Sequence, residues 1–283
     1  MKISTMSIVC GTTACNARCP FCVSKTTPEA NLTTDFNWRN LNIACRLAEK
    51  AGATTCLITG KGEPTLYPKL IEEYIRYVNK YFPFIELQTN GIALPSISHD
   101  TLELWYDMGL TTVSLSAVHY DQFTNEEIYG ANYTPLEDNI KRLHDIGFSV
   151  RLSMMILKGY GLDYPQGISS LISFAKRNKV EQLTVRQIDQ GCTRNENQEI
   201  FDWIDEHMIS HEEWIKIQSM IDRRGNAVLR LPWGAVVYDV DGQNICLNNC
   251  LTTNEDDENI RQIIFFPSGQ ISYDWKYKGS RLI

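Results

Sequence analysis

The feature that most limits the fold of this chain is an alternation of short β-rich runs with helical patterns. Six β-rich runs fall in its first two thirds, at residues 6–11, 54–59, 84–89, 111–116, 149–157 and 181–188. Helical patterns separate them, as in 68–82, where apolar residues recur at three- and four-residue spacing. Strands that alternate with helices predict a parallel sheet covered by helices. We therefore expect either an open doubly wound sheet or a barrel.

The alternation stops near residue 190, and the last third of the chain follows another pattern. One more helix and two alternating runs are expected there, over 211–225, 235–247 and 261–275. An Asp-Gly pair and a Ser-Gly pair lie within the two runs, and such pairs predict β-hairpins. The expected organisation is a core over residues 1–190 with an α plus β-hairpin extension over residues 191–283.

The overall composition disfavours several classes of protein. The 283 residues carry a net charge of -7, and an acidic surface disfavours a large nucleic-acid partner. No run of about 18 apolar residues is present, so no membrane span is expected. The first apolar stretch is too short and too polar for a signal peptide. We therefore expect a cytoplasmic protein whose thiols stay reduced.

Four of the nine cysteines lie close together near the start of the chain, in "CGTTACNARCPFC". Clustered cysteines in a reducing compartment indicate metal binding or catalysis rather than disulfides. Cys15, Cys19 and Cys22 can supply three thiolate ligands. A structural zinc site needs a fourth ligand. An iron–sulfur cubane is normally held by four thiolates, so three would leave one iron open to bind a substrate.

The spacing Cys15-x3-Cys19-x2-Cys22, with Phe21 directly before the third cysteine, resembles the signature of the radical S-adenosylmethionine (SAM) enzymes. The resemblance extends over roughly residues 4–190. It implies a partial (β/α)6 TIM-type barrel and a [4Fe–4S] cluster that the three cysteines bind. In this family SAM binds the open iron and is cleaved by an electron, here from a donor such as flavodoxin or ferredoxin. The resulting 5′-deoxyadenosyl radical takes a hydrogen atom from the substrate.

The segment "TGKGEPT", after the second expected strand, resembles the Gly-Gly-Glu motif of this family. Small residues there let the backbone approach the ligand, and an acid receives the SAM ammonium. Gly60, Gly62 and Glu63 match the motif, although Lys61 separates the two glycines. A simple strand-to-helix turn is the alternative interpretation.

The resemblance places further SAM-binding candidates at or near the ends of the following strands, where parallel barrels form their sites. Together with Phe21, these candidates are Thr89, Asn90, Ser114, Ser116, Ser153 and Arg186. Ser114 and Ser116 have the same parity and therefore share one face of the fourth strand. A polar interior residue satisfied by backbone or water is the alternative for each serine. Arg186 and Gln187 point to opposite faces, and we expect Arg186 to line the cavity.

The other cysteines receive separate interpretations. Buried structural positions are expected for Cys10, Cys45 and Cys56, because free cysteine is among the most buried residue types. Cys246 and Cys250 are expected near the end of a strand, in a segment over the barrel mouth. Three interpretations stay open for this pair: a structural role, a thiol that returns hydrogen to a product radical as in family epimerases, or ligation of a second cluster with Cys192.

The resemblance predicts an enzyme whose radical abstracts hydrogen from a small polar or nucleotide-like substrate. It is nearest to short relatives of the molybdenum-cofactor radical cyclases and of the peptide-modifying enzymes. Radical epimerisation or crosslinking of a peptide is the alternative substrate chemistry. A non-catalytic iron–sulfur or zinc-binding module is the alternative of another class. Residues 191–283 are expected to close the barrel mouth and to help select the substrate.

Overall fold

The computed structural model describes residues 2–193, 197–231, 234–249, 259–277 and 279–283. Its strands form one eleven-stranded sheet in the order β11-β10-β1-β2-β3-β4-β5-β6-β9-β8-β7. The strands are β1 (Lys2–Val9), β2 (Thr55–Thr59), β3 (Phe84–Thr89), β4 (Leu110–Ala117), β5 (Ser149–Ile156), β6 (Gln182–Gln187), β7 (Gly225–Arg230), β8 (Val236–Val240), β9 (Gln243–Asn249), β10 (Asn259–Phe265) and β11 (Ile271–Ser272).

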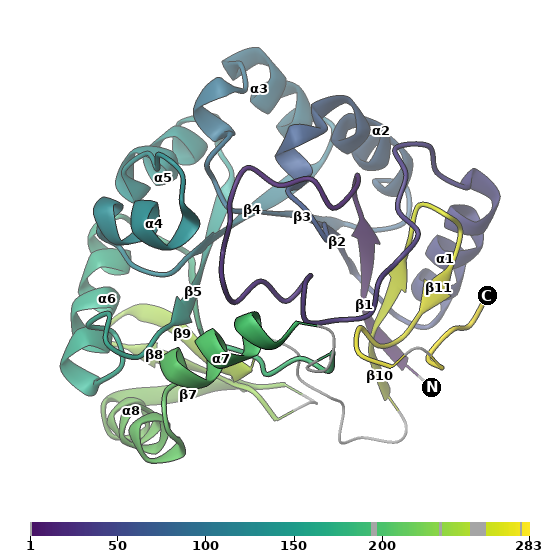
Figure 1. The fold of residues 1–283 in the computed structure, drawn as a ribbon. Coiled ribbons are helices and arrows are strands. Elements are labelled where there is room, and N and C mark those ends of the chain that lie inside the picture. The colour runs from purple at the N-terminus through teal and green to yellow at the C-terminus, as the bar shows by residue number, and fades with distance from the viewer. Residues whose placement is uncertain (1, 194–196, 232–233, 250–258, 278) are drawn as a thin grey trace.

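Most helices lie on the outer side of the curved sheet, whereas the helix of residues 198–207 lies in front of its lower part (Figure 1). The helices are α1 (Trp38–Lys50), α2 (Pro68–Val78), α3 (His99–Asp107), α4 (Gln122–Tyr129), α5 (Leu136–Ile146), α6 (Pro165–Arg177), α7 (Gln198–His207) and α8 (His211–Arg224). None of the described helices is both long and apolar enough to cross a membrane.

Strands β1 to β6 pair in parallel and in sequence order, as the alternation predicts. The last third adds strands at both ends of this row, because β9 pairs in parallel with β6 and β10 pairs in parallel with β1. The two expected hairpins are confirmed as the antiparallel pairs β8–β9 and β10–β11. In the described part of the chain the sheet does not close, since β11 and β7 are its two ends.

The alternation of burial along β5 separates the two faces of the sheet. Leu152 and Met154 are fully buried in the hydrophobic core, whereas Ser153 and Met155 are only half-buried. Side chains of alternate residues point to opposite faces of a strand. One face therefore packs beneath the helices, and the other lines an interior space that we call the lumen.

Three elements were not expected from the sequence: α4, α7 and β7. Helix α4 is only eight residues long and depends on Asp121, whose side chain accepts a hydrogen bond from the Thr124 backbone as an N-cap. A helix of two turns has too few apolar positions to show a clear period. Strand β7 exposes most of its side chains and pairs with β8 at an end of the sheet, so it lacks the apolar alternation that predicts a strand.

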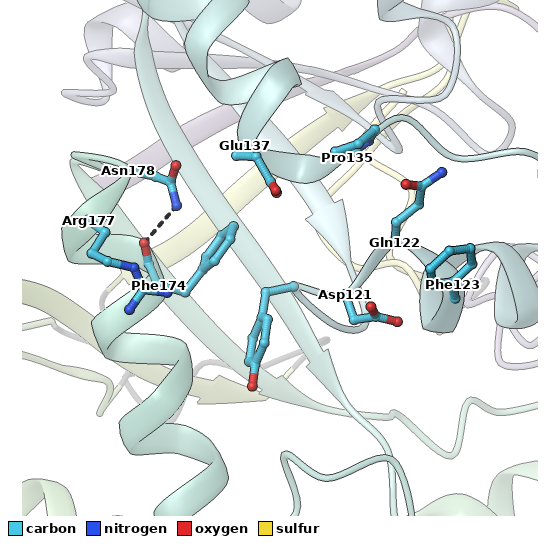
Figure 2. Close-up of a pocket in the computed structure, with 9 residues that line it drawn as sticks. Asp121, Gln122, Phe123, Pro135, Glu137, Phe174, Arg177 and Asn178 are labelled. Carbon is cyan, nitrogen blue, oxygen red and sulfur yellow. Dashed lines mark hydrogen bonds between the residues drawn. The ribbon is translucent and has the colours of Figure 1, made fainter.

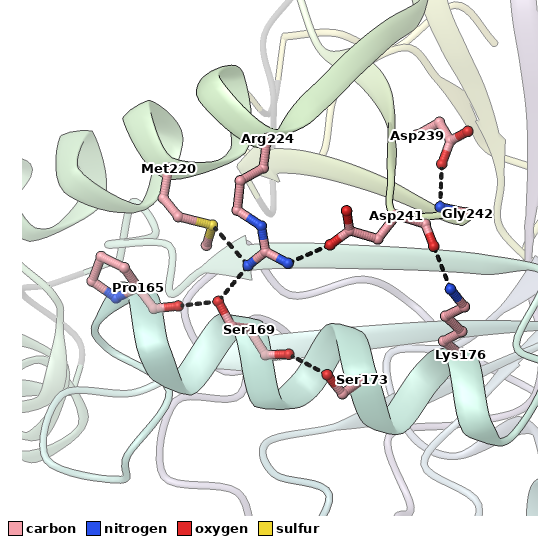
Figure 3. Close-up of polar contacts among 9 residues, drawn as sticks. All are labelled: Pro165, Ser169, Ser173, Lys176, Met220, Arg224, Asp239, Asp241 and Gly242. Atoms are coloured by element: carbon pink, nitrogen blue, oxygen red, sulfur yellow. Dashed lines mark hydrogen bonds and ion pairs between the residues drawn. The ribbon is translucent and has the colours of Figure 1, made fainter.

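Helix α8 attaches the last third of the chain to the core (Figure 3). Nη1 of Arg224, in its last turn, donates to Ser169 Oγ of α6 at 2.8 Å, and Arg224 also pairs with Asp241 in the turn between β8 and β9. Lys176 of α6 donates to the backbone carbonyl of Asp241. The division of the chain near residue 190, and closure of the barrel mouth by residues 191–283, stay predictions.

Candidate active site

The three cysteines of the signature lie on the loop that follows the carboxyl end of β1, which we call the cysteine loop. This loop crosses the open end of the barrel in Figure 1. Cys15 is exposed, and Cys19 and Cys22 are half-buried. Burial raises the pKa of Cys19 to about 12, and negative charge on Cys22 and Cys15 adds to the rise. The Cys22 N–H also donates to the Cys19 carbonyl oxygen at 3.4 Å, so the second and third cysteines lie in one turn of the loop.

These thiols suit iron by their chemistry, because soft thiolates are the ligands of iron–sulfur clusters. A bound metal also deprotonates a coordinating thiol, which offsets the raised pKa. Among the described residues, no three Cys, His, Asp or Glu side chains already surround one point as metal ligands. The role of the three thiols as ligands stays a prediction.

Cys10, Cys45 and Cys56 are fully buried in the hydrophobic core, which confirms the expectation for all three. Cys10 lies directly after β1, and burial raises the pKa of its thiol, with the charge of Glu63 adding to the rise. A thiol of this kind behaves as a small apolar side chain. Cys10 therefore belongs to the core rather than to the ligand set.

Gly62 lets the loop after β2 lie directly on the cysteine loop. A Cβ atom built on Gly62 would stand 2.2 Å from the carbonyl oxygen of Ala14 and 2.6 Å from that of Thr12. The neighbouring Glu63 N–H donates to the same Ala14 oxygen at 3.0 Å. The expected close backbone approach is therefore present, but the structure shows it between two loops.

We expect a Gly62→Ala substitution to displace the loop that carries Cys15. The new methyl group meets backbone oxygens, which cannot move without the loop, and overpacking of this kind costs about 1–3 kcal/mol. Urea unfolding and the iron content after anaerobic reconstitution measure the two effects. Ser170→Ala is the control, because Ser170 is exposed on α6 and its hydroxyl donates to the Gln166 carbonyl of the same helix. Iron uptake equal to that of the parent protein would show that the contact does not position the thiols.

Glu63 joins the end of β2 to the end of β3 through its carboxylate. Its Oε1 accepts hydrogen bonds from Thr65 N at 3.0 Å, from Thr65 Oγ1 at 2.5 Å and from Thr89 Oγ1 at 2.6 Å. Its Oε2 accepts from Asn90 N at 2.9 Å. The side chain is buried, and each carboxylate oxygen offers about two lone-pair sites. Oε2 therefore retains capacity for one further donor.

Asn90 links this network to the cysteine loop. Its Nδ2 donates to Asn16 Oδ1 at 2.7 Å and reaches Cys15 Sγ at 3.7 Å. Its Oδ1 accepts from the Ile92 backbone at 2.9 Å, which fixes the side-chain orientation. The predicted residues Glu63, Thr89 and Asn90 therefore meet beside the first cysteine, and their roles toward SAM stay predictions.

Lys61, which separates the two glycines, has a structural role that the sequence did not indicate. It is buried, and its Nζ donates to the carbonyl oxygens of Pro28 at 2.5 Å and Thr27 at 3.5 Å. Its own carbonyl accepts a hydrogen bond from Ser24. Burial lowers the pKa of the amine, while the nearby charge of Cys22 raises it. Lys61 thus fastens the segment that follows the third cysteine.

Four neighbouring strands place small polar side chains level with one another on the lumen side, because these residues are register partners. From β4 to β9, this row consists of Ser116, Ser153, Thr184 and Cys246. Ser114 lies two residues earlier on β4, opposite Arg151, and Arg186 lies two residues later on β6, opposite Met155. The structure therefore places all the predicted lumen residues on one curved wall.

Cys246 lies inside β9, beside Thr184 of β6, and not in a segment over the barrel mouth as expected. Cys250 lies outside the described residues. Cys192 is exposed on the loop after β6, and its Sγ donates to the carbonyl oxygen of Lys276 at 3.4 Å. The roles of these three cysteines stay predictions.

Helix α7 places aromatic side chains next to the cysteine loop. The ring of Phe21 lies 5.9 Å from that of Trp203, and Trp203 stacks on His207 at 3.9 Å. Phe21 itself is half-buried. The apolar residues of "QEIFDWIDEH" are the signal that could have located this helix.

A groove of about 540 Å³ lies away from these residues, among α4, the start of α5 and the end of α6 (Figure 2). Its lining residues are Tyr120, Asp121, Gln122, Phe123, Pro135, Glu137, Phe174, Arg177 and Asn178. None of the predicted site residues belongs to this lining. The groove is therefore separate from the candidate active site.

Comparison with known proteins identifies the family. The model of the radical SAM superfamily matches residues 9–172. The GTP 3′,8-cyclase of Aquifex aeolicus is 26% identical over 226 residues, which are 77% of this chain and 64% of that protein. AlbA, the antilisterial bacteriocin subtilosin biosynthesis protein of Bacillus subtilis, is 27% identical over 147 residues, or 51% of this chain and 31% of AlbA.

A solved structure shows the same fold. SuiB of Streptococcus suis, bound to S-adenosylmethionine, has a TM-score of 0.61 and 17% identity over 95% of this chain and 60% of SuiB. Together with the open parallel sheet, this likeness confirms the predicted partial TIM-type barrel. The chain spans less than two thirds of each of these three relatives.

The family match covers more than half of the chain and includes both the cysteine loop and the Glu63 network. Membership of this family implies SAM and an iron–sulfur cluster as cofactors. The sequence and the comparisons agree on one conclusion: the chain belongs to the radical SAM superfamily.

Proposed function

We propose that this chain binds a [4Fe–4S] cluster through Cys15, Cys19 and Cys22, cleaves SAM reductively and abstracts hydrogen from a small polar or nucleotide-like substrate. The observation that carries this proposal is the meeting of three features at one end of the parallel sheet. These are the cysteine loop, the close backbone contact at Gly62 and the buried carboxylate network of Glu63. The reducing electron comes from a donor such as flavodoxin or ferredoxin.

In this proposal the protein side chains hold and orient the cofactors. When bound, the cluster and SAM supply a 5′-deoxyadenosyl radical. Glu63 Oε2 accepts a hydrogen bond from the SAM ammonium, since it is the carboxylate oxygen with remaining capacity. Ser116 and Ser153 are half-buried on the lumen wall and bind polar groups of SAM. Phe21 and Trp203 shield the site from water.

Two observations support a small polar substrate. The lumen wall carries Arg151, Gln182 and Arg186 beside its serines, so it suits a polar molecule rather than an apolar one. The GTP 3′,8-cyclase of Aquifex aeolicus aligns with 77% of this chain. A modified peptide is the second candidate, because AlbA belongs to bacteriocin biosynthesis and the SuiB fold covers 95% of the chain.

The proposal is tested by anaerobic reconstitution followed by incubation with SAM and dithionite. We expect about four iron atoms per chain, the stoichiometry of a cubane, and formation of 5′-deoxyadenosine. Deuterated GTP then tests the nucleotide class, because abstraction transfers deuterium into 5′-deoxyadenosine, which mass spectrometry detects. Preferential binding of zinc, or iron binding without SAM cleavage, would indicate a non-catalytic module instead.

We propose Cys246 as a catalytic thiol that gives a hydrogen atom to the product radical. The thiyl radical left on sulfur returns to S–H by taking one electron from the flavodoxin- or ferredoxin-type donor and one proton from solvent. Burial raises the pKa of Cys246 above its usual value, although Arg186, Arg151 and Arg261 oppose the rise. The raised pKa keeps the sulfur as S–H near neutral pH, and only this form can donate a hydrogen atom.

A Cys246→Ala variant should still cleave SAM and still take hydrogen from the substrate, but its product should lack the returned hydrogen. Product mass spectrometry in D2O measures this step. Cys45→Ala, at a buried structural cysteine, is the control for stability. A purely structural Cys246 would instead lose about 1–3 kcal/mol of unfolding free energy while the product stays the same.

A further inference from the structure

The guanidinium of Arg186 lies on the lumen side of β6, and one of its nitrogen atoms, Nε, is the starting point of this inference. Nε is shielded from solvent, and among the residues that the structure describes no hydrogen-bond acceptor contacts it. In the described part of the chain, no ion pair includes Arg186. A desolvated guanidinium is costly unless an anion or other acceptors meet it. An unpaired nitrogen of this kind therefore points to a ligand.

The other charged groups around the lumen already have partners. Arg151, on the neighbouring strand, pairs with Glu86 at 3.0 Å and donates from Nε to Gln182 at 2.9 Å. Glu63 accepts four hydrogen bonds from its neighbours. Asp189, which follows β6, pairs with Lys276 at 2.8 Å. Glu86 and Asp189 are therefore paired with other cations, and Glu63 follows β2, which three strands separate from Arg186 on β6.

Arg186 also has a favourable position along the strand. It lies two residues beyond Thr184, whose register partner on β9 is Cys246. Two residues span about 6.6 Å along a strand. Because β6 and β9 run in parallel toward the barrel mouth, Arg186 lies between the row of Cys246 and the mouth. A molecule that enters the lumen reaches Arg186 before it reaches Cys246.

The SAM-binding candidates at the cysteine loop lie elsewhere in the sheet. Glu63 and the glycines follow β2, and Asn90 follows β3, whereas β6 is separated from β2 by three intervening strands, β3, β4 and β5. Ser153 of the neighbouring strand β5, a proposed SAM contact, lies level with Thr184 and Cys246, whereas Arg186 lies two residues nearer the mouth. This position fits the substrate side of the lumen.

We propose that Arg186 is the anchor of a substrate subsite for an anionic group, a carboxylate or a phosphate. A guanidinium presents paired N–H donors that match the oxygens of both groups. This inference rests on the proposed function, because it names the substrate class of the same lumen. It favours a nucleotide or an acidic metabolite, held with its anionic end toward the mouth and its reacting carbon toward Cys246.

The test measures anion binding to the reconstituted, SAM-bound protein by anaerobic calorimetry, with pyrophosphate and citrate as probes. We expect at least one probe to bind, and Arg186→Gln to weaken that binding by about tenfold or more, as expected for a lost hydrogen bond to a charged group. Arg186→Lys keeps the positive charge without the paired donors, so its probe affinity should fall less than that of Arg186→Gln. Arg76→Gln, at an exposed arginine of α2, is the matched control and should bind like the parent protein.

SAM affinity is measured on the same variants, because Arg186 could bind either the anionic group of a substrate or the carboxylate of SAM. Unchanged SAM affinity together with weakened probe binding supports a substrate subsite. A loss of SAM affinity with unchanged probe binding would assign Arg186 to the SAM carboxylate and overturn the inference. Absence of binding of both probes to the parent protein would overturn it too. Because no turnover is needed, failure of SAM cleavage would count against the proposed function and not against this subsite.

Discussion

A triple variant with Cys15→Ala, Cys19→Ala and Cys22→Ala is expected to bind almost no iron and to form no 5′-deoxyadenosine. The parent protein should bind about four iron atoms per chain. The three thiols lie on one loop at the barrel mouth, and each of Cys15 and Cys19 responds to the charge of Cys22. Since all three sulfurs are removed, no partial ligand set remains. Iron analysis and the absorbance near 400 nm measure the result.

The matched control is Cys45→Ala, which removes a buried thiol of α1 far from this loop in sequence. It should keep full iron and full SAM cleavage. Full iron in the triple variant would mean that other residues hold the cluster, and Cys192 would then be the first candidate, because it is exposed and packs beside the segment after Cys22. Thermal unfolding of all variants shows whether loss of iron reflects loss of the fold.

The core of the fold could be predicted from the sequence because its signals are local. The strand Phe84–Thr89 coincides with an apolar run, and α5 ends at Gly147, whose backbone adopts the left-handed conformation. The places of β9 and β10 could not be predicted in this way. Strand β9 pairs with β6, and β10 pairs with β1. The hydrogen bond from Thr5 of β1 to the carbonyl oxygen of Arg261 in β10 joins residues that are 256 positions apart. A local hydrophobic pattern does not specify such partners.

In the candidate site, too, some residues could be found from local sequence motifs, whereas others are defined only by contacts in the folded chain. The cysteines and Glu63 could be singled out from the sequence because their spacing resembles the motifs of the radical SAM enzymes. The role of Lys61 depends on the carbonyl groups of Thr27 and Pro28, and only the folded loops bring these groups to its amine. That Nε of Arg186 has no acceptor among the described residues is likewise visible only in the folded structure.

Glu63→Gln is expected to weaken SAM binding and to destabilise the protein at the same time. The buried carboxylate accepts from two backbone N–H groups, Thr65 N and Asn90 N, one on each oxygen. A glutamine amide nitrogen can only donate, so it faces one of these N–H groups without a hydrogen bond. We expect a loss of about 1.5–3 kcal/mol in unfolding free energy, and a similar loss in SAM binding free energy from the missing charge.

The two effects are separated by Thr65→Val, which removes one hydroxyl donor to Oε1 and leaves Oε2 and its charge in place. This control should lower the unfolding free energy by about 1.5–3 kcal/mol, the value of a hydrogen bond to a charged group, with SAM affinity unchanged. Urea unfolding and anaerobic calorimetry with SAM measure both quantities on the reconstituted proteins. If Glu63→Gln loses stability while it binds SAM as the parent does, the carboxylate joins β2 to β3 and does not hold the ammonium. The SAM ammonium would then bind the backbone carbonyl groups of the glycine segment, which neither substitution alters.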